Sequence, residues 1–282
     1  MKEDLIVFKQ YFQEAAEKIP SESFFYGTLK HKYRHSIAVW QAGKEIMDQT
    51  PELVEVDDKF RALAERALLF HDVGRFEEAV RRYEDWQKNI LTRASVDKYD
   101  HGIIGYEILK KQPKYNDLRI LLAIKYHGKM MEEVRQSDLW QETEKVPEGA
   151  AARQILYLVR DADKTANLRV IKQEDHLRQD LFFKQLTEEA LKAPISAAVM
   201  QQFKQHQTVL FKNVYSFADR VLMVISWIFD LNYQRTKELF VEEAFGVYLL
   251  DLLSEYGVLP ATVEEIRQVM TRFLGQNCRD KA

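Results

Sequence analysis

Cysteine, glycine and proline are all scarce in this sequence of 282 residues. The one cysteine, Cys278, excludes an internal disulfide framework and favours a reducing compartment. With ten glycines, six prolines and no Asn-Gly or Asp-Gly pair, the sequence carries few of the turn signals that β-hairpins need. These absences argue against both a disulfide-rich scaffold and a β-rich fold.

Long apolar runs and an excess of one charge are missing too. The longest apolar stretch, Val221–Phe229, is too short to cross a bilayer and is interrupted by Ser226. The chain begins with the acidic segment Met1–Asp4, which does not resemble an export signal. A net charge of −3 offers no basic footprint for nucleic acid. We therefore expect a cytoplasmic protein that binds neither membranes nor nucleic acid.

The sequence does contain a helical apolar pattern along nearly its whole length. A composition of 46% apolar and 30% charged residues can support a full core. Because apolar residues recur with helical spacing, the sequence predicts an all-α protein. Helices are expected at about 5–19, 30–47, from 58 through His71 to Gly74, from Asp97 or Asp100 to 109, 117–128 and 151–170, with four or five more beyond 175. The last has a capping box at Thr262–Glu265 and is expected to end at Gly275.

A widely spaced set of histidines and acids falls on the inward faces of these helices. Each residue of this set continues a stripe of apolar residues at helical spacing. A lone inward histidine is usually part of the core, but several together need a cation to compensate their burial. The candidate ligands are His35, His71 with its neighbour Asp72, His101, His127 and Asp163. Imidazoles and carboxylates that meet inside a helical bundle are typical of a divalent metal centre.

These residues, in this order, resemble the H…HD…H…H…D pattern of the HD-domain metal-dependent phosphohydrolase superfamily. The segment Leu69–Phe76 (LFHDVGRF) is similar to the LLHDIGRF signature of bacterial members, and Arg160–Lys164 (RDADK) is similar to their RDADK segment. His101 begins a segment that resembles their HxxxG helix start. The resemblance covers residues 26 to 170 and implies an HD-type helical bundle with additional C-terminal helices.

The resemblance also implies the ligand set. His35, His71, Asp72 and Asp163 would hold one metal, and Asp72, His101 and His127 would hold a second, with Asp72 as the bridge. Two divalent ions are therefore expected, and histidine with carboxylate ligands suits iron, manganese, cobalt, nickel or zinc. Asp163 is the expected ligand, because Ala162–Lys164 with Asn167 resembles the ADR…N ending of related HD hydrolases. Asp161 lies about 200° away on the helix and would not share that face. Asp161 is expected to support the site or to pair with Arg160.

Three regions follow from this interpretation. Residues 1–25 form an N-terminal helix, residues 26–170 form the HD-type metal-binding catalytic core, and residues 171–282 form a helical region that packs on the core. The last region could also provide a homodimer surface. The polar segment 130–148 directly follows His127 and is either a mobile lid or a surface insertion.

Several charged and aromatic residues are candidates for substrate contacts. Asp72 is expected to act in catalysis together with Arg75, the first choice for binding phosphate oxygens, and Lys164, the second. Lys129 is a third candidate but is better explained as a surface charge. The remaining candidates have more ordinary explanations: Arg81–Arg93 as an exposed helix face, His31 as a surface residue, Asp100 as a helix cap or a partner of a ligand histidine, and Tyr33, Trp40, Tyr99, Tyr106 and Tyr126 as core residues rather than a base-stacking pocket.

The favoured function is hydrolysis of a phosphate ester, a nucleotide or another phosphorylated small molecule, by a metal-activated water. One alternative is a di-iron oxygenase similar to inositol oxygenase, which has a comparable ligand set. The other is a nucleotide sensor that uses the HD scaffold without catalysis. All ligand positions are intact, which favours an enzyme.

Overall fold

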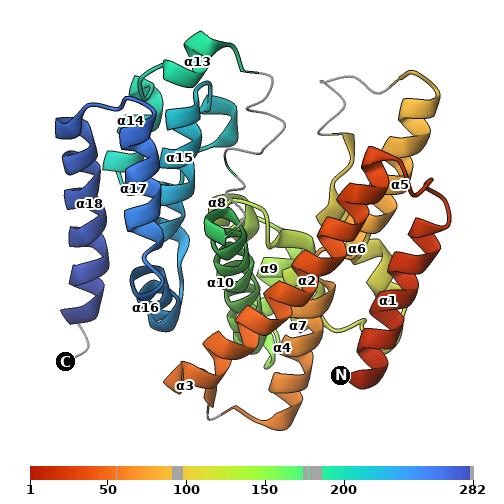
Figure 1. Cartoon of the computed structure of the whole chain (residues 1–282). Helices are drawn as coiled ribbons and strands as arrows, with labels where there is room; N and C mark the ends of the chain where they lie inside the picture. Colours follow the sequence, from red (N-terminus) through yellow and green to blue (C-terminus); the bar gives the residue numbers. More distant parts are fainter. Residues whose placement is uncertain (55, 91–97, 174–176, 178–185, 280–282) are drawn as a thin grey trace. The chain divides into compact units, whose positions relative to one another are not determined.

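The structure, a computed structural model, describes residues 1–54, 56–90, 98–173, 177 and 186–279. Every regular element in these ranges is a helix, so the predicted all-α fold is confirmed. Figure 1 shows the helices in chain order. Among the described residues, no helix has both the length and the apolar character needed to cross a membrane.

The helices fall into two compact units, residues 1–163 and 164–282. The N-terminal unit contains α1 (Lys2–Ala16), α2 (Phe24–Gln49), α3 (Pro51–Val54), α4 (Asp58–Phe70), α5 (Gly74–Gln87), α6 (His101–Lys110), α7 (Leu118–Tyr126), α8 (Met131–Arg135), α9 (Asp138–Thr143) and most of α10 (Gly149–Gln173). The C-terminal unit continues from α10 with α13 (Glu188–Lys192), α14 (Ala197–Lys204), η2 (Phe211–Asn213), α15 (Phe217–Ile225), η3 (Ser226–Asp230), α16 (Gln234–Glu242), α17 (Phe245–Glu255) and α18 (Pro260–Arg279).

Short polar side chains set where several of these helices begin. Asp57 accepts a hydrogen bond from the backbone N–H of Phe60 at 2.7 Å, and Asp117 accepts one from Arg119 at 2.9 Å. Asp100 accepts from the N–H of Gly102 at 2.9 Å. Such caps satisfy backbone donors that a helix end leaves without partners. Asp100 and Asp117 thus fix the starts of α6, which begins with His101, and of α7, which ends directly before His127.

The core of the N-terminal unit lies where α2, α4, α5, α6 and α7 pack against one another. Helix α1 closes one side of this core through Phe8, which is fully buried. The Phe8 ring lies 5.5 Å from that of Phe70 on α4 and 5.3 Å from that of Phe76 on α5, measured between ring centroids. Burial of aromatic rings is a large source of stability, so this cluster anchors the helices that carry the His-Asp pair.

The C-terminal unit has a separate apolar core. Buried residues of α14, α15, α17 and α18 form it, and α15 is buried along nearly its whole length. Figure 1 shows α15, α17 and α18 running beside one another. Ser216 and Asp219 form a capping box at the start of α15.

Three sequence predictions were wrong in detail. Helix α4 ends at Phe70, and Gly74 begins α5 rather than ending the helix before it. The expected loop at 130–148 contains α8 and α9, whose Val134 and Trp140 are buried, so the segment is helical rather than a loop. Polar residues on the exposed faces of these short helices hid their apolar positions.

The third error concerns the last helix. Helix α18 begins at Pro260, ahead of the expected capping box at Thr262, and continues through Gly275 to Arg279. Proline is favoured in the first turn of a helix because it has no N–H to leave unsatisfied. Glycine inside a helix is permitted at a modest energetic penalty, so its presence alone does not mark an end.

Candidate metal centre

The His-Asp pair lies in a tight bend between two helices. The backbone N–H of Val73 donates to the carbonyl of Phe70 at 3.0 Å, and that of Arg75 donates to the carbonyl of Asp72 at 2.9 Å. These two turns end α4 and start α5. His71 and Asp72 are both buried, so the bend presents an imidazole and a carboxylate to the interior of the bundle.

Two glycines allow α6 to lie close to its neighbours, Gly74 at this bend and Gly102 beside α7. A Cβ atom on Gly74 would stand 2.0 Å from the carbonyl oxygen of His101, and one on Gly102 would stand 2.5 Å from the carbonyl oxygen of Lys125. Backbone atoms cannot give way as side chains can, so any larger residue would push α6 away. The glycines therefore determine how near His101 comes to Asp72.

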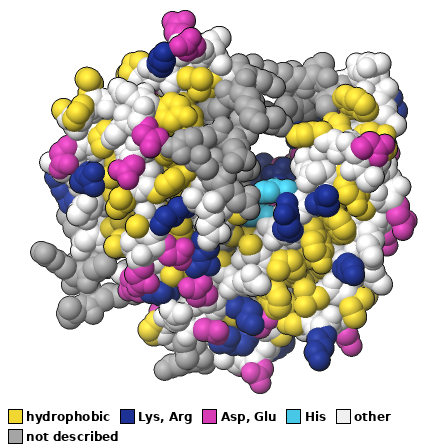
Figure 2. Space-filling model, in the orientation of Figure 1, with side chains coloured by type: hydrophobic (Ala, Val, Ile, Leu, Met, Phe, Trp, Pro, Cys, Tyr) yellow, Lys and Arg dark blue, Asp and Glu magenta, His cyan; other side chains and the backbone are white. Residues whose placement is uncertain are grey.

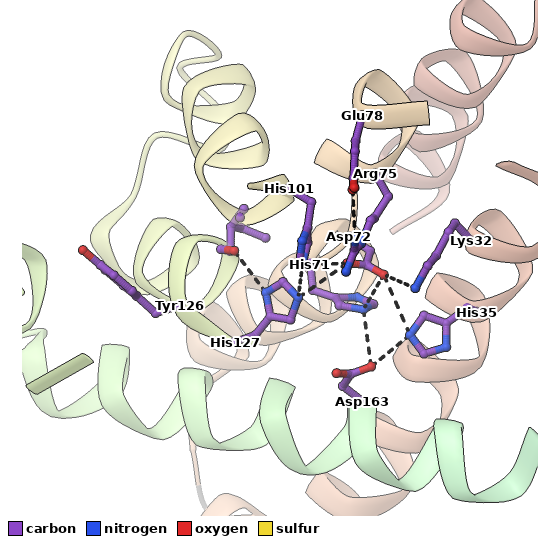
Figure 3. A network of polar contacts seen from close by, with 12 residues as sticks. Lys32, His35, His71, Asp72, Arg75, Glu78, His101, Tyr126, His127 and Asp163 are labelled. Carbon is purple, nitrogen blue, oxygen red and sulfur yellow. Dashed lines mark hydrogen bonds and ion pairs between the residues drawn. The ribbon is translucent and has the colours of Figure 1, made fainter. Parts of the chain in front are cut away.

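One carboxylate oxygen of Asp72 faces a first group of ligands. Oδ2 of Asp72 lies 3.7 Å from Nε2 of His71 and 4.0 Å from Nε2 of His35 on α2. Asp163 on α10 closes this group, with its Oδ1 at 2.9 Å from Nε2 of His35 and 3.9 Å from Nε2 of His71. Figure 3 shows these four side chains turned toward one another.

The other oxygen of Asp72 faces a second group. Oδ1 lies 3.4 Å from Nε2 of His101 and 3.5 Å from Nε2 of His127. The two Nε2 atoms are 3.2 Å apart. Asp72 thus stands between two clusters, each with the residue types and spacing that could hold a metal ion.

Backbone contacts orient two of the imidazoles. Nδ1 of His71 donates to the carbonyl of Leu68 at 2.9 Å, and Nδ1 of His127 donates to the carbonyl of Ile124 at 3.0 Å. With the proton held on Nδ1, each ring directs the lone pair of Nε2 toward Asp72. Metal-ligating histidines are usually held in this way.

Two buried atoms at the centre lack hydrogen-bond partners. They are Nε2 of His71 and Oδ1 of Asp72. A buried polar atom without a partner is unfavourable by about 1–3 kcal/mol, and more when it is charged. A cation in the first group would satisfy Nε2 of His71, and a cation in the second group would satisfy Oδ1 of Asp72, so these ligand atoms fit divalent metals.

The protonation states also suit a metal. Burial lowers the pKa of His71 to about 4 and that of His101 to about 3, so both rings are neutral near pH 7. Burial alone would raise the pKa of Asp72, but Lys32, His71, His127 and Arg75 hold it well below its usual value. Neutral imidazoles and ionised carboxylates are the forms that bind divalent ions.

Two positively charged side chains contact the carboxylate of Asp72. Arg75, a predicted site residue, places Nε 3.6 Å from Oδ1 of Asp72. Lys32, which the sequence interpretation missed, places Nζ 3.2 Å from Oδ2. Lys32 precedes His35 by one helical turn on α2, and that shared face is the signal that could have identified it.

A pocket of about 460 Å³ opens beside the second ligand group. Basic side chains and the ligand pair His101 and His127 form much of its wall, and in Figure 2 histidine atoms reach the surface next to Lys and Arg side chains. The lining residues are Arg75, Glu78, Arg82, Tyr99, Asp100, His101, Gly102, Lys125, His127, Gly128 and Lys129. The pocket therefore suits an anionic ligand.

Glu78 organises the arginines of this pocket. It is 3% exposed and accepts from Nη1 of Arg75 at 2.8 Å, while its second oxygen lies 2.6 Å from Nη2 of Arg82. Arg82 was expected to belong to an exposed helix face, but it lines the pocket. Its position one turn beyond Glu78 on α5 is a sequence signal for this contact.

Other predicted residues take different roles. Lys164 pairs with Asp230 at 2.7 Å, and its proposed contact with phosphate remains a prediction. Lys129 pairs with Asp100 at 2.7 Å and lines the pocket, although it was expected to be a surface charge. Asp100 caps α6, as expected. His31 stacks near His35, with 6.4 Å between ring centroids.

The five aromatic residues considered for a base-stacking pocket do not form one. Tyr33 stacks on Phe8 of the core, and Trp40 donates to Glu65. Tyr126 points away from the cluster in Figure 3. Of the five, Tyr99 lines the pocket beside the ligands.

Arg160 fixes the chain that follows His127. The side chain is buried, and its Nη1 donates to the carbonyls of Tyr126, His127 and Lys129 at 3.3, 2.8 and 2.6 Å. Carbonyls at the end of a helix need such donors, and a cation there also complements the helix dipole. Asp161, its neighbour, is fully buried.

Comparison with known proteins agrees with this geometry. The family model of the HD domain matches residues 33–178, just over half of the chain. No curated protein and no solved structure matches the chain. HD domains bind divalent metals, and the matched range contains every candidate ligand described above. The chain belongs to the HD domain family.

Proposed function

We propose that the protein is a phosphohydrolase that cleaves the phosphate ester of a small molecule with the help of two divalent metal ions. The observation that carries the proposal is the position of Asp72. Its two oxygens face two clusters of metal-binding type, and one cluster opens into a pocket with four basic side chains. The pocket thus pairs a metal centre with a site for an anion.

The residues would divide the work as follows. His35, His71, Asp72 and Asp163 would hold one ion, and Asp72, His101 and His127 would hold the other. When bound, divalent ions supply Lewis-acid chemistry that activates water near neutral pH and offsets charge on a phosphoryl group. Arg75 would bind the non-bridging oxygens, because a guanidinium offers paired donors to phosphate.

Glu78 keeps Arg75 in place for that task. The Arg75 side chain is 30% exposed, and its ion pairs with Asp72 and Glu78 restrict its position. Burial lowers the pKa of Arg75, but the two carboxylates raise it by more, so the guanidinium stays charged. A charge held in advance stabilises a transition state better than one that must reorganise. Lys164 remains a second proposed phosphate contact.

Hydrolysis of a panel of phosphate monoesters and diesters, measured by release of the alcohol, tests the proposal. The purified protein would be loaded in turn with manganese, iron, cobalt, nickel or zinc. We expect release that requires metal, and a fall of roughly a hundredfold in kcat/KM for Arg75→Met, the scale of losing one positioned donor. Arg267→Met, in the C-terminal unit and 46% exposed, is the matched control.

Two results would overturn the proposal. One is consumption of oxygen by the iron-loaded protein without hydrolysis of any ester, which would identify an oxygenase. The other is tight binding of a nucleotide without turnover under any metal, which would identify a sensor.

A further inference from the structure

The two positively charged side chains beside Asp72 are held in different ways. Arg75 lies 3.6 Å from Oδ1 of Asp72 and also pairs with the buried carboxylate of Glu78 at 2.8 Å. Lys32 lies 3.2 Å from Oδ2, and in the part of the chain that the structure describes Asp72 is its one ion-pair partner. Lys32 therefore depends on Asp72 for its counter-charge, whereas Arg75 has a second carboxylate.

The oxygen that Lys32 contacts is the one that faces the first ligand group. Oδ2 of Asp72 lies 3.7 Å from Nε2 of His71 and 4.0 Å from Nε2 of His35. An ammonium at this oxygen reduces the negative charge that the oxygen can offer to a metal ion, and like charges at short range repel each other. Lys32 and an ion of the first group thus compete for the same oxygen.

Metal binding would leave the site with an excess of positive charge. The ligand set contains two carboxylates, those of Asp72 and Asp163, and Lys32 offsets part of their charge in the metal-free chain. Two divalent ions would more than compensate both carboxylates, and the ammonium of Lys32 would then add to the excess. A charged group that loses its counter-charge in a partly buried site needs another one. An anion is therefore the partner that Lys32 would lack.

Lys32 is placed to reach such an anion. Its side chain is 26% exposed, whereas that of Asp72 is 4% exposed. Figure 3 shows Lys32 and Arg75 approaching Asp72 from the side away from Asp163. A lysine has a flexible stem and a compact charge, so its ammonium can change partners by bond rotation while α2 stays in place.

We propose, on the basis of the proposed function, that Lys32 is an anion ligand controlled by the metal: it neutralises Asp72 in the metal-free protein and binds a phosphate oxygen once the first group holds an ion. Arg75 has a different role, because Glu78 holds its guanidinium in place with or without metal. The site would then gain a cation for the phosphate group at the moment it becomes loaded.

Manganese titration of the full chain tests the competition. In the His101→Gln background, which disrupts the second group, Lys32→Met should bind manganese roughly tenfold more tightly or better, because a unit charge beside the ion is removed. Lys30→Met is the matched control, since Lys30 is exposed on the same helix and should leave the affinity unchanged. Unchanged or weaker manganese binding by the Lys32→Met variant overturns the inference.

Calorimetric titration with inorganic phosphate tests the anion ligand. In manganese-loaded protein, Lys32→Met should bind phosphate about tenfold less tightly, the scale of losing one hydrogen bond to a charged group. In metal-free protein the loss should be much smaller, because Asp72 still occupies the ammonium. Equal phosphate affinity of the two loaded proteins overturns the inference, as does an equal loss with and without metal. Absence of phosphate binding by the loaded wild type overturns it too.

Neither titration requires turnover, so the inference and the proposed function can fail separately. If both responses occur and no phosphate ester is hydrolysed, the proposed function fails and the role of Lys32 stands. If esters are hydrolysed and Lys32→Met changes neither affinity, the inference fails and the phosphohydrolase stands. Lys32→Gln, which keeps a hydrogen-bond donor without the charge, provides the same two tests if Lys32→Met does not fold.

Discussion

Nε2 of His101 lies 3.2 Å from Nε2 of His127, although His101 begins α6 and His127 follows the end of α7. His127 is oriented by its own backbone contact through Nδ1, which leaves Nε2 as an acceptor directed at the same point as Asp72. Two imidazole nitrogens that lie beside the same carboxylate oxygen make a set of ligands that could hold one metal ion. In the proposed function this pair would hold the second of the two ions.

Loss of one histidine of this pair should remove one ion. We expect the wild-type chain to bind two ions, and His101→Gln to bind one, because His35, His71 and Asp163 remain as a complete group. Metal content after equilibrium dialysis, measured by plasma mass spectrometry, checks this. His35→Gln is the mirror variant and should also retain one ion. If His101→Gln kept two ions, the second group would not be a metal site.

Asp72 should matter more than any other acid of the site. Because its two oxygens face both groups, Asp72→Asn should lose both ions and at least a hundredfold in turnover, the scale of removing a ligand that is itself needed for catalysis. Asp161→Asn is the isosteric control on α10, and we expect it to retain metal. The reverse result, in which Asp161→Asn loses its metal and Asp163→Asn retains it, would overturn the choice of Asp163 as the ligand.

The sequence was sufficient to predict the helical class and the six ligand candidates. Four of these candidates could be identified because each continues an apolar stripe: His35, His71, His101 and His127. Helical periodicity can be recognised in a sequence without knowing which residues each helix packs against. The bend at His71 could not be predicted. Gly74 reads locally as a helix end, whereas its role is set by the carbonyl of His101 in a distant segment.

Contacts between charged residues were the least predictable part of the site. Arg82 was assigned to a solvated face because the surrounding sequence is rich in charge, yet buried Glu78 holds it in the pocket wall. Lys32 was missed because its spacing of one turn before His35 indicates a shared helix face but belongs to no motif. Whether a charge faces water or a carboxylate depends on the packing of other helices, which one sequence does not reveal.

Arg160 should support the site without touching substrate. Arg160→Met would remove the donor to three carbonyls that follow α7, and the loss of such buried contacts lowers the free energy of unfolding by about 3 kcal/mol. Because His127 belongs to the freed segment, metal affinity of the second group should fall as well. Urea unfolding and metal titration check the two effects. Arg267→Met, an exposed pair with Glu264, should change stability little, and equal losses in both variants would refute the role of Arg160.

Acid should destabilise the metal-free protein at pH values where ordinary carboxylates are still ionised. In the folded chain burial lowers the pKa of His71 to about 4, whereas an unfolded histidine titrates near 6.5. Between these values the unfolded state binds more protons than the folded state, so the free energy of unfolding falls as pH falls. The difference for this fully buried ring corresponds to about 3 kcal/mol, present in full above pH 6.5 and lost by pH 4. His101, with its pKa lowered to about 3, acts in the same direction.

The buried carboxylates do not produce this effect. The pKa of Asp72 is held well below its usual value of 3.8, so its contribution to stability is lost only in stronger acid. Urea unfolding in EDTA at pH 7.5, 6.5, 5.5 and 4.5 separates the pH range in which the histidines affect stability from the more acidic range in which Asp72 does. We expect stability to be constant from pH 7.5 to 6.5 and then to decline, with a shallower decline in His101→Gln because one buried imidazole is gone. A wild-type profile that stays flat to pH 4.5 would show that these rings accept protons in the folded state, and a ligand cluster of neutral imidazoles would then be ruled out.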